Sequence, residues 1–368
     1  MTERPGEAQA AGFLRGRSEE EFAAELAAIA RTDKNVRPRG WRLSPKAVVL
    51  FLIGGKTPDG TPIRPKYVGE RRLMEIAVAT LATDRALLLY GPPGTAKSWV
   101  SEHIAAAICG NSTRIVQGTA GTDENAIRYG WNYAKLLAEG PSEAALVATP
   151  LVRAMREGAI ARIEELTRIP SETQDCLITV LSEKTMPVPE ISSEIRARDG
   201  FNVIATANDR DRGVNEMSAA LRRRFNVVFL PPPATVEEEI AIVSRRVAEL
   251  GKTLDAPPDV MPADELRKIV SIFRELRNGI TEDGKKKLRA TSGSLSAAEA
   301  ISVAGGGLSL ALHFGDGRVR GRDVAAALVG AVVKDQAQDA VALREYMTLV
   351  AKTRKGWEEL AKSCLELL

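Results

Sequence analysis

A loop with two glycines, followed by a lysine and a serine, is the stretch of this chain with the clearest chemistry. It reads Gly91-Pro-Pro-Gly94-Thr-Ala-Lys97-Ser98, and an apolar segment, residues 87–90, precedes it. Gly91 and Gly94 allow backbone N–H groups to turn inward without obstruction by a Cβ atom. A helical pattern follows Ser98, and its N-terminus would add partial positive charge. The pattern therefore predicts a cradle for phosphate groups.

Each part of this loop has an expected role. The Lys97 ammonium would reach the terminal phosphates, and the Ser98 hydroxyl would be a ligand of Mg²⁺. Ala96 stands where the strict pattern has glycine, so a methyl group there requires a negative φ angle. The alternative is an ordinary strand-to-helix turn rich in glycine and proline. We expect the following residues to bind the phosphates: Gly91, Pro92, Pro93, Gly94, Thr95, Ala96, Lys97, Ser98 and Trp99.

Two acidic residues, Glu164 and Glu165, end the next predicted buried strand, residues 158–165. Hydrolysis needs one carboxylate that holds the metal through water and another that polarises the attacking water. Ligands of open α/β sheets bind at the carboxyl ends of the strands, where this pair would lie. We therefore assign the metal to Glu164 and water activation to Glu165. The alternative is that both acids only solvate the end of a strand.

Two further groups fit the same chemistry. Asn208 closes the apolar strand 201–208 and could orient the attacking water; as an alternative, it is a turn residue. The run Arg222-Arg-Arg224 precedes Phe225 and could stabilise charge on the γ-phosphate held by a neighbouring subunit. The alternative for the arginines is a solvated helix face.

The elements that would position these residues alternate between strands and helices. This alternation predicts an α/β domain with a parallel sheet and helices on both faces. The predicted strands are 87–90, 114–118, 158–165, 201–208 and 225–230, and the predicted helices are 44–53, 70–82, 99–108, 171–183 and 218–224, with an earlier helix opened by a capping box at Ser18.

The connecting segments also carry predictions. Residues 54–65 are expected to be loop, and 185–200 a turn or short hairpin. Residues 119–158 read as a mostly helical insertion. Three aromatic residues at its middle, Tyr129, Trp131 and Tyr133, could grip a substrate, but we favour packing of the insertion. His103 is expected to be a packed or surface residue rather than a ligand.

The composition changes at residue 231. A proline run opens a part of the chain that contains only helical patterns, at 235–250, 262–278, 294–312, 321–335 and 340–366. We therefore predict an N-terminal helical extension over 1–64, an α/β nucleotide-binding domain over 65–231, and a helical region over 232–368.

Composition limits the other classes of function. The chain has 368 residues, of which 44% are hydrophobic, which is ample for two or three domains. The formal net charge of +3 argues against nucleic acid or an anionic membrane as the main partner. Three widely spaced cysteines predict a reduced, cytoplasmic protein without disulfides, and the lack of Cys/His pairs argues against zinc. No apolar stretch reads as a membrane span, and the N-terminal sequence lacks the pattern of an export signal.

Three stretches together resemble the AAA+ ATPases, specifically their MoxR branch: 91–98, 164–174, and 205–208 with 220–225. The resemblance covers roughly residues 65–335. It implies a P-loop NTPase domain of three layers followed by an all-helical lid. By position, Lys97 and Ser98 match Walker A, Glu164 and Glu165 match Walker B, Asn208 matches sensor 1, and Arg224 best matches the arginine finger. Residues 119–158 resemble the helix-2 insert, and 185–200 the insertion before sensor 1.

The resemblance also implies partners and cofactors. Family members use ATP and Mg²⁺, form rings that are usually hexameric with the nucleotide between subunits, and frequently work with a von Willebrand A-domain protein. Two positions depart from the family pattern. Glu164 replaces the usual Asp, and Ser294 occupies the place where a sensor 2 arginine often stands, with Arg289 nearby in sequence. Both departures point to slow hydrolysis or to a site that depends on a partner.

The leading hypothesis is a cytoplasmic MoxR-type ATPase that hydrolyses ATP to remodel or activate a client protein, in a chaperone-like or metal-insertion role. A scaffold that binds ATP but barely hydrolyses it is the alternative from another class, favoured by the departures at Glu164 and Ser294. A chelatase-type motor subunit remains a close alternative. A nucleic-acid motor is disfavoured by the near-neutral charge.

Overall fold

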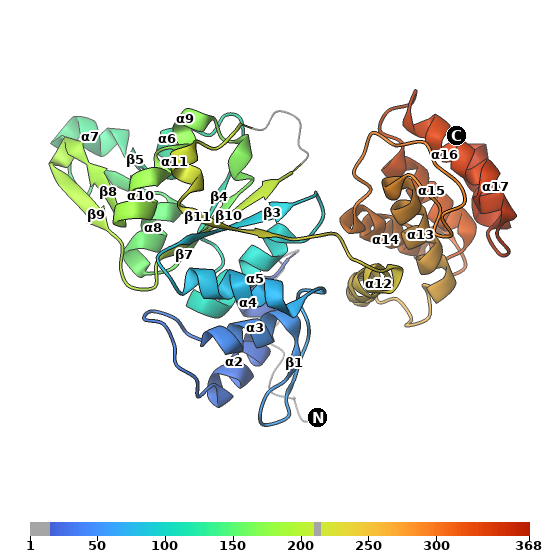
Figure 1. Cartoon of the computed structure of the whole chain (residues 1–368), viewed down its shortest axis with the longest axis horizontal. Coiled ribbons are helices and arrows are strands. Elements are labelled where there is room, and N and C mark those ends of the chain that lie inside the picture. Colours follow the sequence, from blue (N-terminus) through green and yellow to red (C-terminus); the bar gives the residue numbers. More distant parts are fainter. Residues whose placement is uncertain (1–14, 210–214) are drawn as a thin grey trace. The chain divides into compact units, whose positions relative to one another are not determined.

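Figure 1 shows the computed structural model of the chain, which describes residues 15–209 and 215–368. The structure divides into two compact units. The first contains the chain up to Gly91 together with Ala96–Leu230, and the second contains Pro92–Thr95 together with Pro231–Leu368. The boundary between the α/β part and the helical part therefore falls at the start of the proline run.

The first unit is organised around a five-stranded parallel sheet of order β11-β3-β10-β7-β4. Every strand predicted from the sequence is present. From β3 the chain crosses to β4 at one edge and returns through β7 and β10, while β11 lies on the other side of β3. The strand order reverses between β3 and β10, and ligands bind beyond the carboxyl ends of strands at such a point. The strands are β3 (Ala86–Gly91), β4 (Ile115–Gln117), β7 (Ile160–Glu164), β10 (Asn202–Asn208) and β11 (Phe225–Phe229).

Helices cover both faces of this sheet, because successive strand residues point to opposite sides. In β3, Leu87 and Leu89 belong to one apolar core, and Leu88 belongs to the other. The first core is completed by α4 and α5, and the second by α8 and α10. The sheet is the middle of three layers, as predicted. These helices are α4 (Arg71–Leu81), α5 (Lys97–Cys109), α8 (Pro150–Glu157) and α10 (Leu177–Glu183).

The N-terminal segment packs into the same core as α4 and α5, through residues such as Phe22 and Phe51. Its elements are α1 (Ser18–Glu21), α2 (Ala23–Thr32) and α3 (Pro45–Ile53). Ser44 caps α3 as its sequence indicates, since its hydroxyl accepts from the Ala47 N–H at 3.3 Å. The cap of α1 lies one residue earlier than predicted, at Arg17, whose N–H donates to Glu20. The predicted loop 54–65 contains a short hairpin, β1 (Gly55–Lys56) and β2 (Pro62–Ile63).

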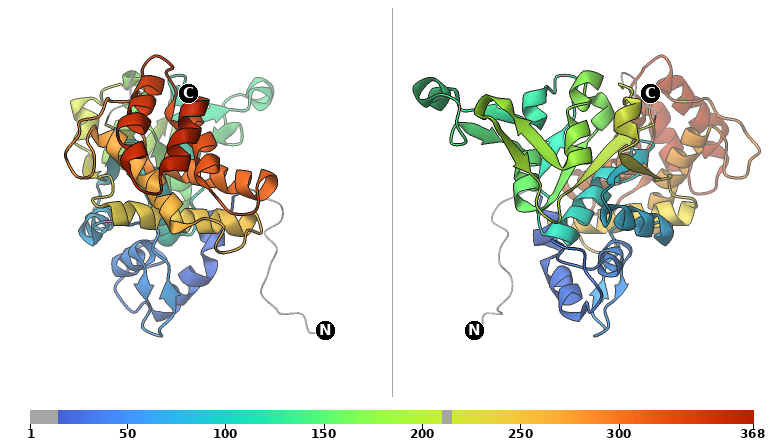
Figure 2. Two further views of the ribbon diagram at one scale, coloured as in Figure 1. Left: turned by 90° about the vertical axis from the view of Figure 1, so that its right-hand side faces the viewer. Right: turned by 60° about the vertical axis from the view of Figure 1, so that its left-hand side comes forward.

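The insertion 119–158 is less helical than predicted. Between α6 (Glu124–Ile127) and α8 it forms an antiparallel pair, β5 (Tyr129–Trp131) and β6 (Leu146–Ala148), separated by α7 (Tyr133–Glu139). Tyr129 is buried and packs edge-on against Trp131, with ring centroids 5.8 Å apart, which fits the packing role. Tyr133 is 74% exposed and does not pack. It lies on α7, which projects from the body of the first unit (Figure 2).

Two further segments of the first unit differ in detail from the sequence prediction. The helix expected over 171–183 is two helices, α9 (Ser171–Gln174) and α10. The segment 185–200 does form a hairpin, with β8 (Thr185–Val188) antiparallel to β9 (Ser193–Arg196).

The second unit is a bundle of helices around one core that includes Phe273, Leu308 and Tyr346. The last predicted helix is interrupted near Gly356 and forms two. By length and composition alone, α14 could cross a membrane, contrary to the expectation from the sequence, but it packs against α12, α13 and α15. The helices are α12 (Val236–Thr253), α13 (Ala263–Asn278), α14 (Ala297–Phe314), α15 (Gly321–Val332), α16 (Asp339–Leu349) and α17 (Glu358–Leu367).

Candidate functional site

The predicted phosphate loop connects the end of β3 to the start of α5, at the carboxyl edge of the sheet. Gly91 has φ of 150°, and a Cβ atom there would lie 2.4 Å from the Leu230 carbonyl oxygen. Gly94 has φ of 77°. Both positions therefore require glycine, one because the backbone of the neighbouring segment approaches closely and both because φ is positive.

Ala96 differs from its prediction. Its φ is 63° and its ψ is 23°, so it adopts the left-handed conformation instead of the expected negative φ. This conformation costs an L-residue about 1–2 kcal/mol relative to glycine. Ala96 is nevertheless the N-cap of α5, and its carbonyl accepts from the Val100 N–H at 2.8 Å. The strain lies in the loop predicted to hold phosphate, where functional sites commonly store it.

The Lys97 side chain folds back over the loop. It is only 7% exposed, and its ammonium donates to the Gly91 carbonyl at 2.8 Å. The Thr95 hydroxyl donates to the Pro92 carbonyl at 2.9 Å, which closes the turn. A cation held at the mouth of a loop beside a helix N-terminus favours an anion there.

Ser98 and Glu164, which the sequence assigns to the metal, are in direct contact. The Ser98 hydroxyl donates to Glu164 Oε2 at 2.6 Å. Glu164 is 2% exposed. Burial would raise the pKa of its carboxyl group, but the nearby Arg162 charge and three hydroxyl donors lower that pKa below its ordinary value. Glu164 is therefore held as a carboxylate inside the sheet edge, with its charge balanced.

Glu165 turns away from its neighbour and toward the surface. Its φ of 54° is left-handed, and its N–H donates to the Thr206 hydroxyl at 3.0 Å. That hydroxyl in turn donates to Glu164 Oε2 at 2.7 Å, so Thr206 on β10 ties the two acids together. The Glu165 carboxylate accepts from Arg168 at 2.9 Å and is about one-third exposed. The two acids therefore have different environments, one buried and one accessible.

Asn208 ends β10 directly opposite Gly91 in the parallel register. The Asp209 N–H also donates to the Gly91 carbonyl at 3.3 Å. β10 lies between β3 and β7, so Asn208 stands between the phosphate loop and the acid pair, at the edge where the sheet topology places a ligand. The structure thus brings Lys97, Ser98, Glu165 and Asn208 to one edge of the sheet.

Arg224 does not lie at that edge. It precedes β11, whose first residue pairs with Ala86 at the start of β3, so Arg224 is at the amino ends of the strands. Its guanidinium donates to Ser182 and to the Ala220 carbonyl within the same chain. Its side chain is therefore not part of the site that its own chain forms.

The Trp99 side chain also points away from the phosphate loop. Its indole N–H donates to the Lys66 carbonyl at 2.9 Å, and its ring centroid lies 4.3 Å from that of His103. Only the Trp99 backbone can therefore face a phosphate. His103 is packed, as expected, because it is fully buried on α5. The Nδ1–H of His103 donates to the Trp99 carbonyl at 2.7 Å.

The residues present fit Mg²⁺ that arrives with a nucleotide, but not a metal held by the protein alone. No group of three or more His, Cys, Asp or Glu side chains suited to a metal occurs within residues 15–209 and 215–368. The Ser98 oxygen keeps lone pairs free after donating to Glu164, and Mg²⁺ is commonly bound by one or two protein oxygens together with substrate phosphates.

Comparison with known proteins agrees with this geometry. Residues 86–225 match the model of the AAA domain of the dynein-related subfamily, and 237–362 match the C-terminal domain of YehL-like AAA+ ATPases. Protein YehL of Escherichia coli (strain K12) is 41% identical over 338 residues, 91% of this chain and 91% of YehL. The chain belongs to the YehL-like AAA+ ATPases. It therefore has the P-loop AAA+ fold with a helical C-terminal region.

More distant relatives share only part of the YehL-like chain. Protein SH1500 of Staphylococcus haemolyticus (strain JCSC1435) is 31% identical over 169 residues, 45% of this chain and 63% of that protein. Among solved structures, NtrX of Brucella abortus in complex with ADP superposes with a TM-score of 0.50 at 17% identity, over 81% of this chain and 64% of the NtrX chain. At that identity the likeness shows the fold alone.

Sequence reasoning missed four side chains that surround the acid pair of this YehL-like protein. Arg168 and Thr206 lie inside the stretches 164–174 and 205–208 that carry the family resemblance but received no role there, and Ser101 and Arg162 lie outside those stretches. Position offers a signal in retrospect: Arg162 and Thr206 lie two residues before a motif residue on the same face of a strand, and Ser101 lies one helical turn after Ser98. The four are Ser101, Arg162, Arg168 and Thr206.

The structure also shows the contacts of Ser294, which stands where a sensor 2 arginine was expected, and of the nearby Arg289. Arg289 pairs with Glu345 at 3.5 Å, and Ser294 lies 3.4 Å from Glu299. Ser296 and Glu299 form a capping box that begins α14. The Arg277 guanidinium donates to the Leu295 carbonyl at 2.7 Å, so Arg277 contacts the segment leading into α14.

Proposed function

We propose that this YehL-like protein is a cytoplasmic MoxR-type enzyme that hydrolyses ATP with Mg²⁺ and uses the cycle to remodel or activate a partner protein. One observation carries the catalytic part. Asn208 lies in register with Gly91, between the phosphate loop and the strand that ends in the acid pair. A water molecule held there would face a phosphate on one side and Glu165 on the other.

The residues then divide the work. The Lys97 ammonium, now on the Gly91 carbonyl, would transfer its hydrogen bond to the terminal phosphates. The Ser98 hydroxyl would keep its hydrogen bond to Glu164 and offer its oxygen to Mg²⁺, which neutralises phosphate charge when bound. Glu165 would accept a proton from the water that Asn208 orients. Arg224 would act on the γ-phosphate of a neighbouring subunit, which agrees with its distance along the strands from its own loop.

The partner assignments rest on family resemblance. MoxR-type proteins form rings, usually hexamers, and frequently act with a von Willebrand A-domain protein. The balanced net charge supports a protein client over nucleic acid. The exposed Tyr133 and Leu137 on the projecting α7 leave an apolar surface in the insertion.

Phosphate release and nucleotide binding test the catalytic part. Glu165→Gln should reduce turnover at least about 100-fold while nucleotide stays bound, because only the proton acceptor is lost. Lys97→Ala should weaken nucleotide binding about tenfold or more. Glu172→Gln and Lys46→Ala change exposed residues of the same types and serve as matched controls. Unchanged turnover in Glu165→Gln, or unchanged binding in Lys97→Ala, would refute the assignment.

A scaffold that binds ATP and hydrolyses it weakly is the second candidate, favoured by the Arg168–Glu165 ion pair. That pair occupies the carboxylate needed to accept a proton. Phosphate release that stays near background with and without partner protein, while nucleotide still drives assembly, would support the scaffold.

A further inference from the structure

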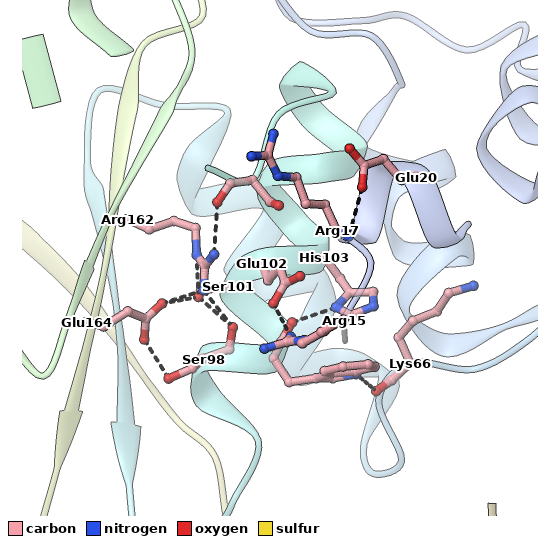
Figure 3. Close-up of polar contacts among 12 residues, drawn as sticks. Arg15, Arg17, Glu20, Lys66, Ser98, Ser101, Glu102, His103, Arg162 and Glu164 are labelled. Atoms are coloured by element: carbon pink, nitrogen blue, oxygen red, sulfur yellow. Dashed lines mark hydrogen bonds and ion pairs between the residues drawn. The ribbon is translucent and has the colours of Figure 1, made fainter. Parts of the chain in front are cut away.

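Arg162 lies on β7 two residues before Glu164, so both side chains point to the same face of the sheet, toward α5. The Arg162 side chain is only 6% exposed. Figure 3 shows it with Glu164, Ser98 and Ser101 on one side of α5, and His103, Arg15 and Lys66 on the other side. A buried arginine at this place needs partners for its fixed fork of donors.

Every arm of the guanidinium is engaged. Nε donates to the Ser101 hydroxyl at 3.0 Å, and Nη1 donates to the Ser112 carbonyl at 2.9 Å. Nη2 donates both to the Ser98 carbonyl at 3.0 Å and to Glu164 Oε1 at 2.8 Å. Arg162 therefore joins β7 to the first turn of α5, where the metal-ligand serine is located.

The Glu164 carboxylate is saturated by this arrangement. Oε1 accepts from Arg162 and from the Ser101 hydroxyl at 2.6 Å. Oε2 accepts from the hydroxyls of Ser98 at 2.6 Å and Thr206 at 2.7 Å. A carboxylate offers about four lone-pair sites, and here four donors fill them. In this arrangement Glu164 acts on a metal through Ser98 and not as a direct ligand.

We propose that Arg162 is the positioning residue that allows glutamate to work at position 164, an inference that rests on the proposed ATPase function. Glutamate has one more rotatable bond than aspartate, so its carboxylate needs a second anchor. Arg162 and Ser101 hold Oε1, which leaves Oε2 aimed at the Ser98 hydroxyl. Arg162 also donates to the Ser98 carbonyl, so hydrogen bonds hold both the backbone and the side chain of Ser98. The Ser98 hydroxyl oxygen still has lone pairs for Mg²⁺.

The test measures binding of a non-hydrolysable ATP analogue as Mg²⁺ is titrated, together with kcat and the KM for ATP. Arg162→Met should raise the Mg²⁺ concentration for half-maximal binding about tenfold and lower kcat, with a smaller change in the KM for ATP. Arg162→Lys should recover part of the loss, because an ammonium reaches fewer of the four acceptors.

A double-mutant cycle separates positioning from general stability. In a Glu164→Asp background, Arg162→Met should change the Mg²⁺ requirement by no more than about twofold, because the shorter carboxylate no longer needs the second anchor. Equal effects of Arg162→Met in both backgrounds would overturn the inference, as would a Mg²⁺ requirement that Arg162→Met leaves unchanged.

Two further measurements keep the outcome interpretable. If Arg162→Met does not fold, Ser101→Ala removes only the second donor to Oε1, and its smaller effect on the Mg²⁺ requirement, about threefold, should disappear with Glu164→Asp in the same way. Lys97→Ala and the unmodified protein are assayed in parallel. If the unmodified protein neither binds nucleotide nor hydrolyses it, the proposed function is refuted. If Arg162→Met and Glu164→Asp change the Mg²⁺ requirement additively, only the role of Arg162 is refuted.

Discussion

Each unit of this protein buries a carboxylate against arginine, and the two sites differ in what else they contact. In the helical unit, Glu239 of α12 is fully buried and accepts from Arg277 at 2.8 and 3.0 Å and from Arg274 at 3.5 Å. Both arginines come from α13, so the cluster joins two helices of one bundle. In the first unit, Glu164 has one arginine and three hydroxyl donors, and two of these hydroxyls, Ser98 and Ser101, belong to α5, the helix that follows the phosphate loop.

This difference separates a packing role from a functional one. Around Glu239, arginine also donates to the Leu295 carbonyl and to the carbonyls of Pro233 and Ala234, so the cluster fixes backbone segments of the helical unit. Around Glu164, the ion pair with Arg162 lies beside the Ser98 hydroxyl and beside Glu165, a second acid that is partly exposed at the sheet edge. Because both units contain a buried ion pair, the pair alone does not distinguish them; the contact of the Glu164 pair with groups that could bind a ligand does.

The largest effect should come from breaking the cluster in the helical unit. Glu239→Gln leaves the partly buried Arg277 without its counter-charge and should lower the free energy of unfolding by about 3 kcal/mol. Replacing both, Glu239→Leu with Arg277→Leu, should recover most of that loss. Chemical denaturation would measure it, with the exposed Glu237→Gln as control, expected to change stability by less than about 1 kcal/mol. If Glu239→Gln lowered the free energy of unfolding only slightly, the proposed packing role of the Glu239 cluster would be wrong.

A second effect concerns the face of α5 that does not contact Glu164. Burial, together with the nearby charges of Lys66, Arg15 and Arg162, lowers the pKa of His103 from 6.5 to about 3. His103 Nε2 is buried and has no hydrogen-bond partner among the described residues, so a proton there would be uncompensated. The unfolded chain takes up this proton near pH 6.5, and the folded protein does not. The stabilisation is therefore complete above pH 6.5 and is lost progressively as the pH falls toward 3.

The expected loss is about 2 kcal/mol of unfolding free energy between pH 6.5 and pH 5. His103→Gln, which is uncharged and can still donate to the Trp99 carbonyl, should flatten this part of the profile. His313→Gln provides the matched control, because the second histidine of the chain is exposed and its replacement should leave the profile unchanged. Denaturation curves at several pH values would show whether the two variants differ; identical profiles would contradict the assignment.

A third prediction concerns Glu165, the more exposed of the two acids at the site. Arg168 and Glu165 form an ion pair that is partly exposed, so Arg168→Ala should change stability by less than about 1 kcal/mol. Because the pair restrains the Glu165 carboxylate, the variant should release phosphate several-fold faster. Slower turnover would show that Arg168 holds Glu165 in its working position. Arg153→Ala, on the exposed surface of α8, controls for loss of a surface charge.

The smallest effect should come from the strained cap of α5. Ala96→Gly removes the methyl group that opposes a positive φ, at the expense of a more flexible unfolded chain. The sum is a gain of about 0.5 kcal/mol in stability. Thermal unfolding would measure it, and Ala107→Gly in the same helix should instead destabilise, because that position is helical and buried. A loss for Ala96→Gly would mean that the alanine is not strained.

Local patterns of residue type were enough to predict the sheet, the phosphate loop and the two acids. Strand and helix periodicities act over a few residues, and so do glycine positions such as Gly91, so the chain alone carries them. The same patterns failed where two states compete locally. Tyr129–Trp131 and Leu146–Ala148 are strands because they pair with each other within the insertion, and segments of three residues are too short to show a strand periodicity of their own.

Residue types and spacing in the chain were sufficient to place Lys97, Ser98, Glu165 and Asn208 in one chemistry, because each ends or follows an element of a parallel sheet. Their actual partners depend on how distant segments pack. Arg162 finds Ser112 and the Ser98 carbonyl far along the chain, and Ala96 adopts a positive φ because the loop between β3 and α5 must turn there. Contacts of this kind arise from the packed fold, since no local preference for burial predicts which donor a buried carboxylate will meet.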